Sequence, residues 1–355
     1  MSAPALHLVV DEIHRRHADP GGHPERPERI AAVHHALGAA AVAPYLREHP
    51  TPAPDWAALT TVHDPAYVER VRAACRRATA SGWSGLDGDT YVTAESDVVA
   101  ARFATATREA ALQAAAVGEL WFVLGRPPGH HAGRAGAAFG APSLGFCLFN
   151  HAALALQALR ARGERVLVID FDVHHGNGTQ EIFWEAADVV HIDVHQAGIY
   201  PGTGDVTDDG GGPARGTKLN IPLPAGAGDG EQAWVQQAVV ARLLEAWQPT
   251  VVVVSAGFDA HAADPLAQLR CTEAAFAAWG RRLGDAWRAG TPKAIVSVLE
   301  GGYGPGLPRC AVAYAAGLLG LGEAPGVRPH APPEPVRAAL AERLRQRWGL
   351  SLAEV

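Results

Sequence analysis

The chain has 355 residues, of which 48% are hydrophobic, and its formal net charge at pH 7 is −7. That length suits one large α/β domain or two smaller ones. The charges are spread along the chain, which speaks against a basic nucleic-acid-binding surface. The N-terminus has no signal-peptide pattern, no apolar run approaches the roughly 20 residues of a membrane span, and no CxxC pair occurs. We therefore expect a cytoplasmic protein with reduced cysteines that binds neither nucleic acid nor membranes.

Short apolar runs alternate with helical segments along much of the chain. The runs predict strands at residues 6–10, 120–124, 166–169, 189–194, 219–223, 251–254 and 294–299. Helices are predicted at residues 97–117, 149–162 and 231–247. This alternation predicts a mostly parallel sheet with helices on both faces. Ligands of such sheets bind beyond the carboxyl ends of the strands.

The C-terminal part differs in composition from the rest. Residues 321–334 are rich in proline and predict a surface connector, and residues 335–348 predict an amphipathic helix. We expect residues 1–320 to form one domain, with residues 321–355 as a connector and helix that belong to it. The helix is expected to pack on the core, and a homo-oligomer contact is the alternative.

Polar side chains follow two of the predicted strands directly. Strand 166–169 leads into Asp170, Asp172 and His174, and strand 251–254 is followed by Asp259. Two carboxylates and one imidazole can hold a divalent metal, and catalytic zinc commonly keeps three protein ligands and one open position. The two carboxylates neutralise the charge of the ion, so its bound water needs a nearby base.

A pair of histidines after strand 120–124 can provide that base. His130 and His131 stand in a Pro/Gly turn, and Asp170 and Asn177 are candidate orienting partners. A carboxylate partner stabilises the imidazolium more than a neutral amide does. The histidine that meets Asn177 is therefore predicted to be the better general base, and the other the electrostatic stabiliser.

Tyr303 follows Gly301 and Gly302 after strand 294–299, where a phenol can donate to a developing oxyanion. Alone, each of these patterns has an ordinary structural interpretation, such as a solvated histidine pair or a turn with an aromatic anchor. Together, at matching strand ends, they favour hydrolysis of an amide with a metal ion as Lewis acid.

Seven motifs in order resemble the zinc-dependent histone deacetylases, especially the class II-like bacterial members, the histone deacetylase-like amidohydrolases and acetylpolyamine amidohydrolases. They are HPERPER (23–29), RPPGHHA (126–132), GFCLFN (145–150), DFDVHHGNGTQ (170–180), YPGTGD (200–205), SAGFDAHAADPL (255–266) and LEGGY (299–303). The resemblance implies an α/β arginase–deacetylase fold with a central eight-stranded, mostly parallel sheet.

The resemblance also implies a role for individual residues. It places Zn²⁺ on Asp172, His174 and Asp259, pairs His130 with Asp170 and His131 with Asn177, and has Tyr303 assist the transition state. The implied substrate-binding residues are Gly145, Phe146, Tyr200, Leu266 and Gly301, and Arg29 lines an exit channel. Family members also bind structural K⁺, but Asp193 stands where a serine is expected.

The natural substrate stays open at this point. Acetyl-lysine and acetylated polyamines share an acetamide on a methylene chain. The apolar Leu266 favours acetyl-lysine-type substrates, although Asp87 and Asp89 could favour a polyamine. A catalytically inactive scaffold that binds acetyl groups is a further alternative. A two-manganese ureohydrolase is disfavoured because Gly176 and Gly257 occupy the positions of its additional aspartates.

Overall fold

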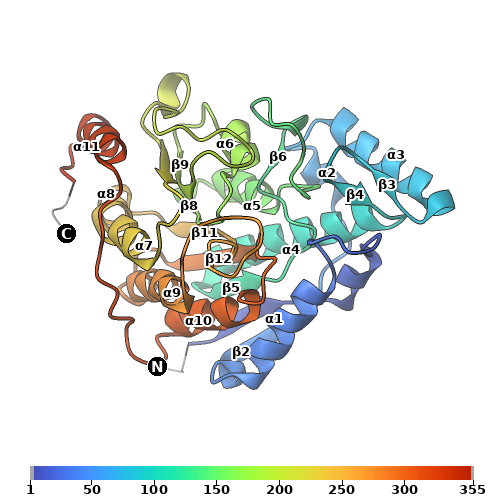
Figure 1. The fold of residues 1–355 in the computed structure, drawn as a ribbon, viewed down its shortest axis with the longest axis horizontal. Helices are drawn as coiled ribbons and strands as arrows, with labels where there is room; N and C mark the ends of the chain where they lie inside the picture. The colour runs from blue at the N-terminus through green and yellow to red at the C-terminus, as the bar shows by residue number, and fades with distance from the viewer. Residues whose placement is uncertain (1–3, 353–355) are drawn as a thin grey trace.

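The structure is a computed structural model that describes residues 4–352 of the chain. Eight strands form one sheet in the order β10-β9-β8-β11-β12-β5-β1-β2, and every neighbouring pair runs parallel (Figure 1). The strands are β1 (Leu6–Val9), β2 (Leu46–His49), β5 (Leu120–Val123), β8 (Val166–Asp170), β9 (Val189–Gln196), β10 (Lys218–Leu223), β11 (Val251–Ala256) and β12 (Ala294–Leu299). Two short hairpins lie outside it, β3–β4 (Ser84–Gly85, Tyr91–Val92) and β6–β7 (Ala132–Gly133, Gly136–Ala137). The eight-stranded sheet is therefore confirmed and is parallel throughout.

The apolar runs predict seven of the eight strands but not β2. Its sequence is LREH, and Arg47 and Glu48 are exposed. β2 pairs only with β1 and forms one edge of the sheet. Charged side chains are common on edge strands, where they discourage pairing with another chain. An edge strand of this kind lacks the hydrophobic pattern on which the prediction rests.

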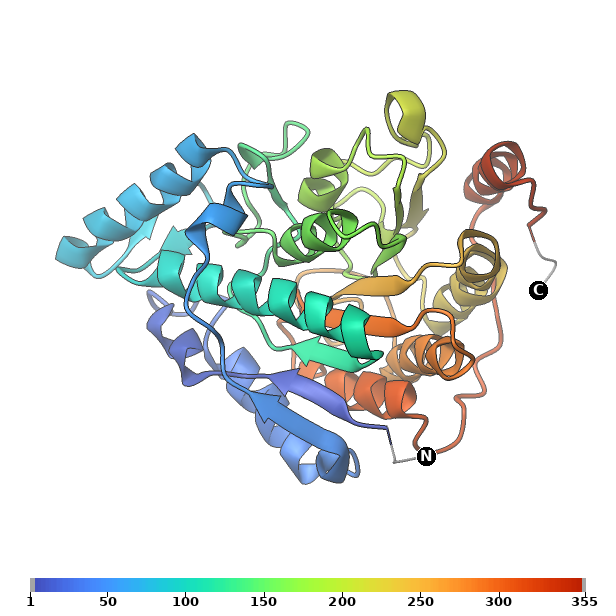
Figure 2. The same ribbon diagram turned by 180° about the vertical axis from the view of Figure 1, so that it is seen from behind.

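Helices cover both faces of the sheet and enclose two hydrophobic clusters (Figures 1 and 2). One face carries α1 (Glu28–Ala39), α7 (Asp229–Val235), α8 (Ala241–Trp247), α9 (Glu273–Arg288), α10 (Leu307–Leu319) and α11 (Glu334–Trp348). The other carries α2 (Trp56–Leu59), α3 (Pro65–Ser81), α4 (Ser96–Val117), α5 (His151–Arg160) and α6 (Asn177–Ile182). A π-helical turn at Gln236–Val240 joins α7 to α8, and short 3₁₀ turns occur at Glu12–Arg16, Ala43–Tyr45 and Gly212–Ala214.

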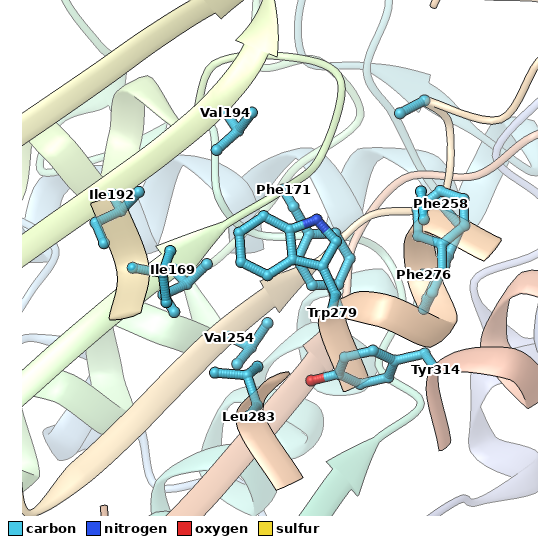
Figure 3. Close-up of a cluster of buried hydrophobic side chains, with 14 of the residues drawn as sticks. Ile169, Phe171, Ile192, Val194, Val254, Phe258, Phe276, Trp279, Leu283 and Tyr314 are labelled. Carbon is cyan, nitrogen blue, oxygen red and sulfur yellow. The ribbon is translucent and has the colours of Figure 1, made fainter. Parts of the chain in front are cut away.

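The segment after β8 alternates between the core and the opposite side. Phe171 stacks on Trp279 of α9 with ring centroids 5.4 Å apart, within a cluster of buried aromatic rings (Figure 3). Phe171 and Val173 are almost fully buried in this cluster. Because neighbouring side chains of an extended segment point to opposite sides, Asp172 and His174 face away from the core. Aromatic packing therefore positions the polar residues of the site.

Near the C-terminus of the chain, α11 lies against β10, which is the edge strand of the sheet opposite β2. The buried guanidinium of Arg343 in α11 donates to the carbonyl oxygens of Lys218 in β10 and of Val206. The side chain of Lys218 is also fully buried, and its Nζ donates to the carbonyl oxygens of Ala186 (3.1 Å) and Val189 (2.7 Å). Burial lowers the pKa of Lys218 to about 7. All four cysteines are free and buried, and no helix in residues 4–352 has the length and hydropathy of a membrane span.

Candidate active site

The three predicted metal ligands meet beyond the carboxyl ends of β8 and β11. One ligand atom each from Asp172, His174 and Asp259 lies within 4.8 Å of the others. His174 Nδ1 is 3.1 Å from Asp172 Oδ1 and 3.2 Å from Asp259 Oδ2. Both carboxylates are buried, and the imidazole is slightly exposed. Two buried carboxylates and an accessible imidazole form a donor set that fits a divalent cation such as Zn²⁺.

The two buried carboxylates shift the pKa values of the residues around them. Although burial disfavours the imidazolium, hydrogen bonds to Asp172 and Asp259 raise the pKa of His174 to about 10. Burial and the charge of Asp172 raise the pKa of Asp259 to about 7. A bound metal ion requires deprotonated ligands, so it competes with these protons for the same oxygen and nitrogen atoms.

Glycines allow the carboxylates to approach the backbone closely. A Cβ atom at Gly257 would overlap Asp172, one at Gly301 would overlap Asp259, and one at Gly176 would overlap Asp170. The backbone N–H of Gly301 donates to Asp172 Oδ2 at 2.7 Å. Gly301 therefore lies against the ligand group, and positions 176 and 257 have no space for the further aspartates of a two-metal site.

The tandem histidines have the two predicted partners. His130 Nδ1 lies 3.0 Å from Asp170 Oδ2, and His131 Nδ1 lies 2.7 Å from Asn177 Oδ1. Asn177 donates its Nδ2–H to the carbonyl oxygen of Ala138, so its Oδ1 accepts the proton of His131 Nδ1. In the neutral ring, His131 Nε2 is then unprotonated and available as a base.

Two histidine rings only 3.9 Å apart acquire different pKa values. Burial and the positive charge of His130 lower the pKa of His131 well below its usual value. Burial also disfavours the charged form of His130, but the negative charges of Asp172 and Asp170 raise its pKa well above the usual value. The two shifts run in opposite directions, in the sense expected for one imidazole with a carboxylate partner and one with an amide partner.

The turn that carries these histidines is held by residues to which the sequence interpretation assigned no role. Glu300 Oε2 accepts hydrogen bonds from the backbone N–H groups of Gly129 (2.7 Å) and His130 (3.2 Å). Buried Arg126 donates to both carboxylate oxygens of Glu25, at 2.9 and 2.7 Å. Glu25, Arg126 and Glu300 all belong to the quoted motifs, but nothing local in the sequence indicates that they interact.

Residues predicted to line the substrate tunnel gather around His131. Gly145 has φ +54°, and a Cβ atom there would lie 2.6 Å from the His131 ring and 2.7 Å from that of Tyr200. Phe146 adopts φ +70°, which is rare for a non-glycine residue, and its ring meets Tyr303 edge to face at 5.4 Å. Tyr200 meets His131 edge to face at 4.9 Å. These contacts bring five predicted residues together, namely His131, Gly145, Phe146, Tyr200 and Tyr303.

The acidic residues considered for the rim have structural partners. Asp87 Oδ2 accepts the backbone N–H of Leu144 at 2.8 Å, and Asp89 Oδ2 accepts the hydroxyl of Ser143 at 2.5 Å. Both carboxylates therefore support the loop that leads to Gly145. This use reduces their capacity to bind the distal ammonium of a polyamine.

Tyr303 contacts Arg29, and its backbone shares a hydrogen-bond acceptor, Asp264, with that of Leu266. The guanidinium carbon of Arg29 is 4.5 Å from the centre of the Tyr303 ring, and both residues line a cavity of about 290 Å³. Burial raises the pKa of Tyr303 well above its usual value, so the phenol keeps its proton. Asp264 accepts the backbone N–H groups of Tyr303 and Leu266, and Leu266 is partly buried. The rim position of Leu266 and the channel role of Arg29 stay predictions.

A second group of potential metal ligands includes Asp170, the carboxylate partner of His130. One atom each of Asp170, His191 and Asp193 lies within 4.8 Å of the others. Asp193 is hydrogen-bonded to His195 Nδ1 at 2.7 Å and to the backbone N–H of Gly176 at 2.9 Å. The carboxylate at the position where a serine is expected is therefore part of a histidine-rich cluster. The presence of K⁺ stays a prediction.

Comparison with known proteins agrees with this geometry. Residues 23–318 match the family model described as the histone deacetylase domain. The chain is 44% identical over 236 residues to an uncharacterized Methanocaldococcus jannaschii protein, of which it spans 66%. It is 35% identical over 309 residues to the histone deacetylase-like amidohydrolase of Pseudomonas aeruginosa, with 84% of this chain and 78% of that protein aligned.

A solved structure supports the same assignment. The crystal structure of the HDA15 HD domain superimposes with a TM-score of 0.85 and 31% sequence identity, covering 98% of this chain and 96% of that one. The predicted arginase–deacetylase fold and the predicted family are thus both confirmed. The chain belongs to the histone deacetylase family.

Proposed function

We propose that the chain is a zinc-dependent amidohydrolase that removes acetyl groups from N-acetylated amines, with acetyl-lysine-type substrates as the first candidate. The observation that carries this proposal is the placement of two histidines, one hydrogen-bonded to a carboxylate and one to an amide, beside a ligand group of two carboxylates and one imidazole. Hydrolysis of an amide needs a base for water, an acid for the leaving amine and stabilisation of the oxyanion.

The residues divide these tasks between them. Zn²⁺ held by Asp172, His174 and Asp259 would supply Lewis acidity to the acetamide oxygen and to water. His131 Nε2 takes the proton of the attacking water and later passes it to the leaving amine. The positive charge of His130 stabilises the negative charge that develops on the substrate. Tyr303 donates its hydroxyl proton in a hydrogen bond to the same oxyanion.

The preference for acetyl-lysine rests on the walls of the proposed tunnel. Phe146 and Tyr200 contribute aromatic surface suited to a methylene chain, and Leu266 would add an apolar rim. Asp87 and Asp89 support a loop, so they give less reason to favour an acetylated polyamine. An inactive acetyl-binding scaffold remains the alternative of another class.

Side-by-side rate measurements test this proposal. Purified protein, with its metal content determined by elemental analysis, is assayed with an acetyl-lysine peptide and with acetylated putrescine, spermidine and cadaverine. We expect acetate release from the peptide by protein that contains one zinc per chain. Zinc-loaded, folded protein that binds the peptide but releases no acetate would favour the scaffold. Faster hydrolysis of a polyamine would reverse the substrate preference.

A further inference from the structure

A cavity of about 630 Å³ lies outside the proposed tunnel. It is formed by the loop at Phe139, by α6 with the residues after it, and by the loop that follows β9. The side chains that matter for its chemistry are those of Phe139, Gln180, Trp184, Asp205 and Asp208.

This cavity shares both of its loops with the tunnel. Tyr200 packs against His131, whereas Gly198 and Gly202 of the same loop line the cavity. Phe139 precedes by only six residues Gly145, which contacts the His131 ring. The cavity and the proposed tunnel are therefore walled by the same two loops.

The walls of the cavity are aromatic. Phe139 is 40% exposed, with φ +51°, and meets the ring of Trp184 edge to face at 5.4 Å. An exposed phenylalanine in this backbone conformation costs free energy without adding to the core. Aromatic faces attract ammonium and guanidinium groups, so the pair is well suited to a cationic side chain.

The cavity also carries two carboxylates that form no close ion pair within the described residues. Asp205 uses Oδ1 to accept hydrogen bonds from Thr207, and Asp208 uses Oδ2 to accept the backbone N–H of Asp205. The remaining oxygen of each carboxylate has no hydrogen bond, and neither forms an ion pair, within residues 4–352. Arg343 of α11 attracts both aspartates at longer range, but its hydrogen bonds go to the carbonyl oxygens of Lys218 and Val206.

A buried amide provides an independent indication of a ligand. Gln180 lines the cavity and is 1% exposed. Its Oε1 is hydrogen-bonded to His175 Nε2 at 3.1 Å, but its Nε2 has no acceptor among residues 4–352. This donor is accessible from the cavity, where water or a ligand supplies its acceptor. A ligand that displaces the water should therefore carry an acceptor as well as a positive charge.

We infer that this cavity binds a lysine or arginine residue that neighbours the acetylated lysine of a peptide substrate. Such a residue has a cationic group for Asp205, Asp208 and the aromatic pair, and a backbone carbonyl that can accept the N–H of Gln180. An acetylated polyamine has the charge but no carbonyl besides that of its acetamide, which the tunnel holds. The inference rests on the proposed deacetylase function and specifies its substrate.

Paired peptides test the inference. Each contains one acetyl-lysine and, at each neighbouring position in turn, either lysine or the uncharged norleucine. We expect a KM about five- to tenfold lower for lysine than for norleucine at one position, with similar kcat, since each exposed ammonium–carboxylate pair contributes modestly. The double variant D205N/D208N should abolish this difference by raising KM for the lysine peptide only.

A matched control separates local from general charge effects. The double variant E109Q/E323Q also removes two exposed carboxylates without an ion pair, outside both loops, and should keep the peptide difference. Equal KM values for every peptide pair, or a difference that persists in D205N/D208N, would overturn the inference. So would an effect of D205N/D208N confined to N-acetylspermidine.

The outcome is distinguishable from failure of the proposed function. If the protein hydrolyses peptides of both series equally, the deacetylase proposal stands and the cavity assignment fails. If it hydrolyses neither, dissociation constants of fluorescently labelled lysine and norleucine peptides provide the same comparison. Tighter binding of the lysine peptide that D205N/D208N abolishes would then support the cavity assignment, and equal binding would contradict it.

Discussion

Replacement of Asn177 by aspartate tests which histidine acts as the base. His131 Nδ1 lies 2.7 Å from the amide oxygen, so the variant places a carboxylate against a ring that otherwise stays neutral. At about 4 Å between charge centres and an effective dielectric constant of about 20, the attraction is about 4 kcal/mol, an upper bound of about 3 pKa units. Measured shifts for such pairs are about 1–3 units, so we expect the pKa of His131 to rise by that amount.

A base with a raised pKa is protonated, and therefore inactive, over a wider range of low pH. The acidic limb of the kcat/KM profile should move upward by about 1–3 pH units, while the plateau above it is largely kept. The lost hydrogen bond to Ala138 should destabilise the fold by about 1–3 kcal/mol. Rates are therefore measured at a temperature where circular dichroism shows folded protein, with zinc content determined in parallel.

The variant D170N is the contrasting control. It removes the carboxylate that stabilises the charge of His130, so it should lower the plateau rate, which N177D should largely keep. An unmoved acidic limb in folded, zinc-loaded N177D would refute the assignment of His131 as the general base.

Three further predictions concern Tyr303, His174 and Lys218. Tyr303→Phe should lower kcat about 100- to 1000-fold, because it removes a hydrogen-bond donor to the oxyanion, while elemental analysis finds the zinc content unchanged. Turnover at the wild-type rate would show that the phenol is not an oxyanion donor. Because the pKa of His174 is raised to about 10, zinc added to metal-free protein near pH 8 should release protons, and an indicator titration that detects none would contradict this site. The pKa of Lys218 is lowered to about 7, so the unfolded chain binds more protons above that pH and the free energy of unfolding gains a positive slope. Lys218→Met should remove up to about 3 kcal/mol of that gain between about pH 7.5 and 9.5, and identical slopes in denaturant titrations would disprove it.

The local sequence predicts the site where polar residues directly follow a recognisable strand. Buried parallel strands read as continuous apolar runs, and the residues that follow them meet at one edge of the sheet. Asp172, His174 and Asp259 could therefore be placed together from the sequence alone. The pairing of His131 with Asn177 came from the family resemblance, and the difference between an amide and a carboxylate partner explains its chemical consequence.

Interactions between distant, individually ordinary residues could not be predicted in this way. Glu25 and Arg126 are 101 residues apart, and nothing in their local sequence indicates a buried ion pair. Lys218 stands in an alternating strand where a lysine is normally exposed, yet its ammonium lies among carbonyl oxygens. β2 lacks an apolar pattern because it is an edge strand. In each case the partner is determined by tertiary packing and not by the neighbouring residues.

The glycines at positions 176 and 257 restrict how this chain could acquire a second metal ion. A carboxylate introduced at Gly257 would displace Asp172, and one at Gly176 would displace the aspartate that orients His130. A variant designed to hold two ions would therefore lose a ligand of the proposed zinc ion, or the carboxylate partner of His130, before a second ion could bind. Under the proposed function the scaffold accommodates one ion, and a two-ion design has to rebuild the segments after β8 and β11 together.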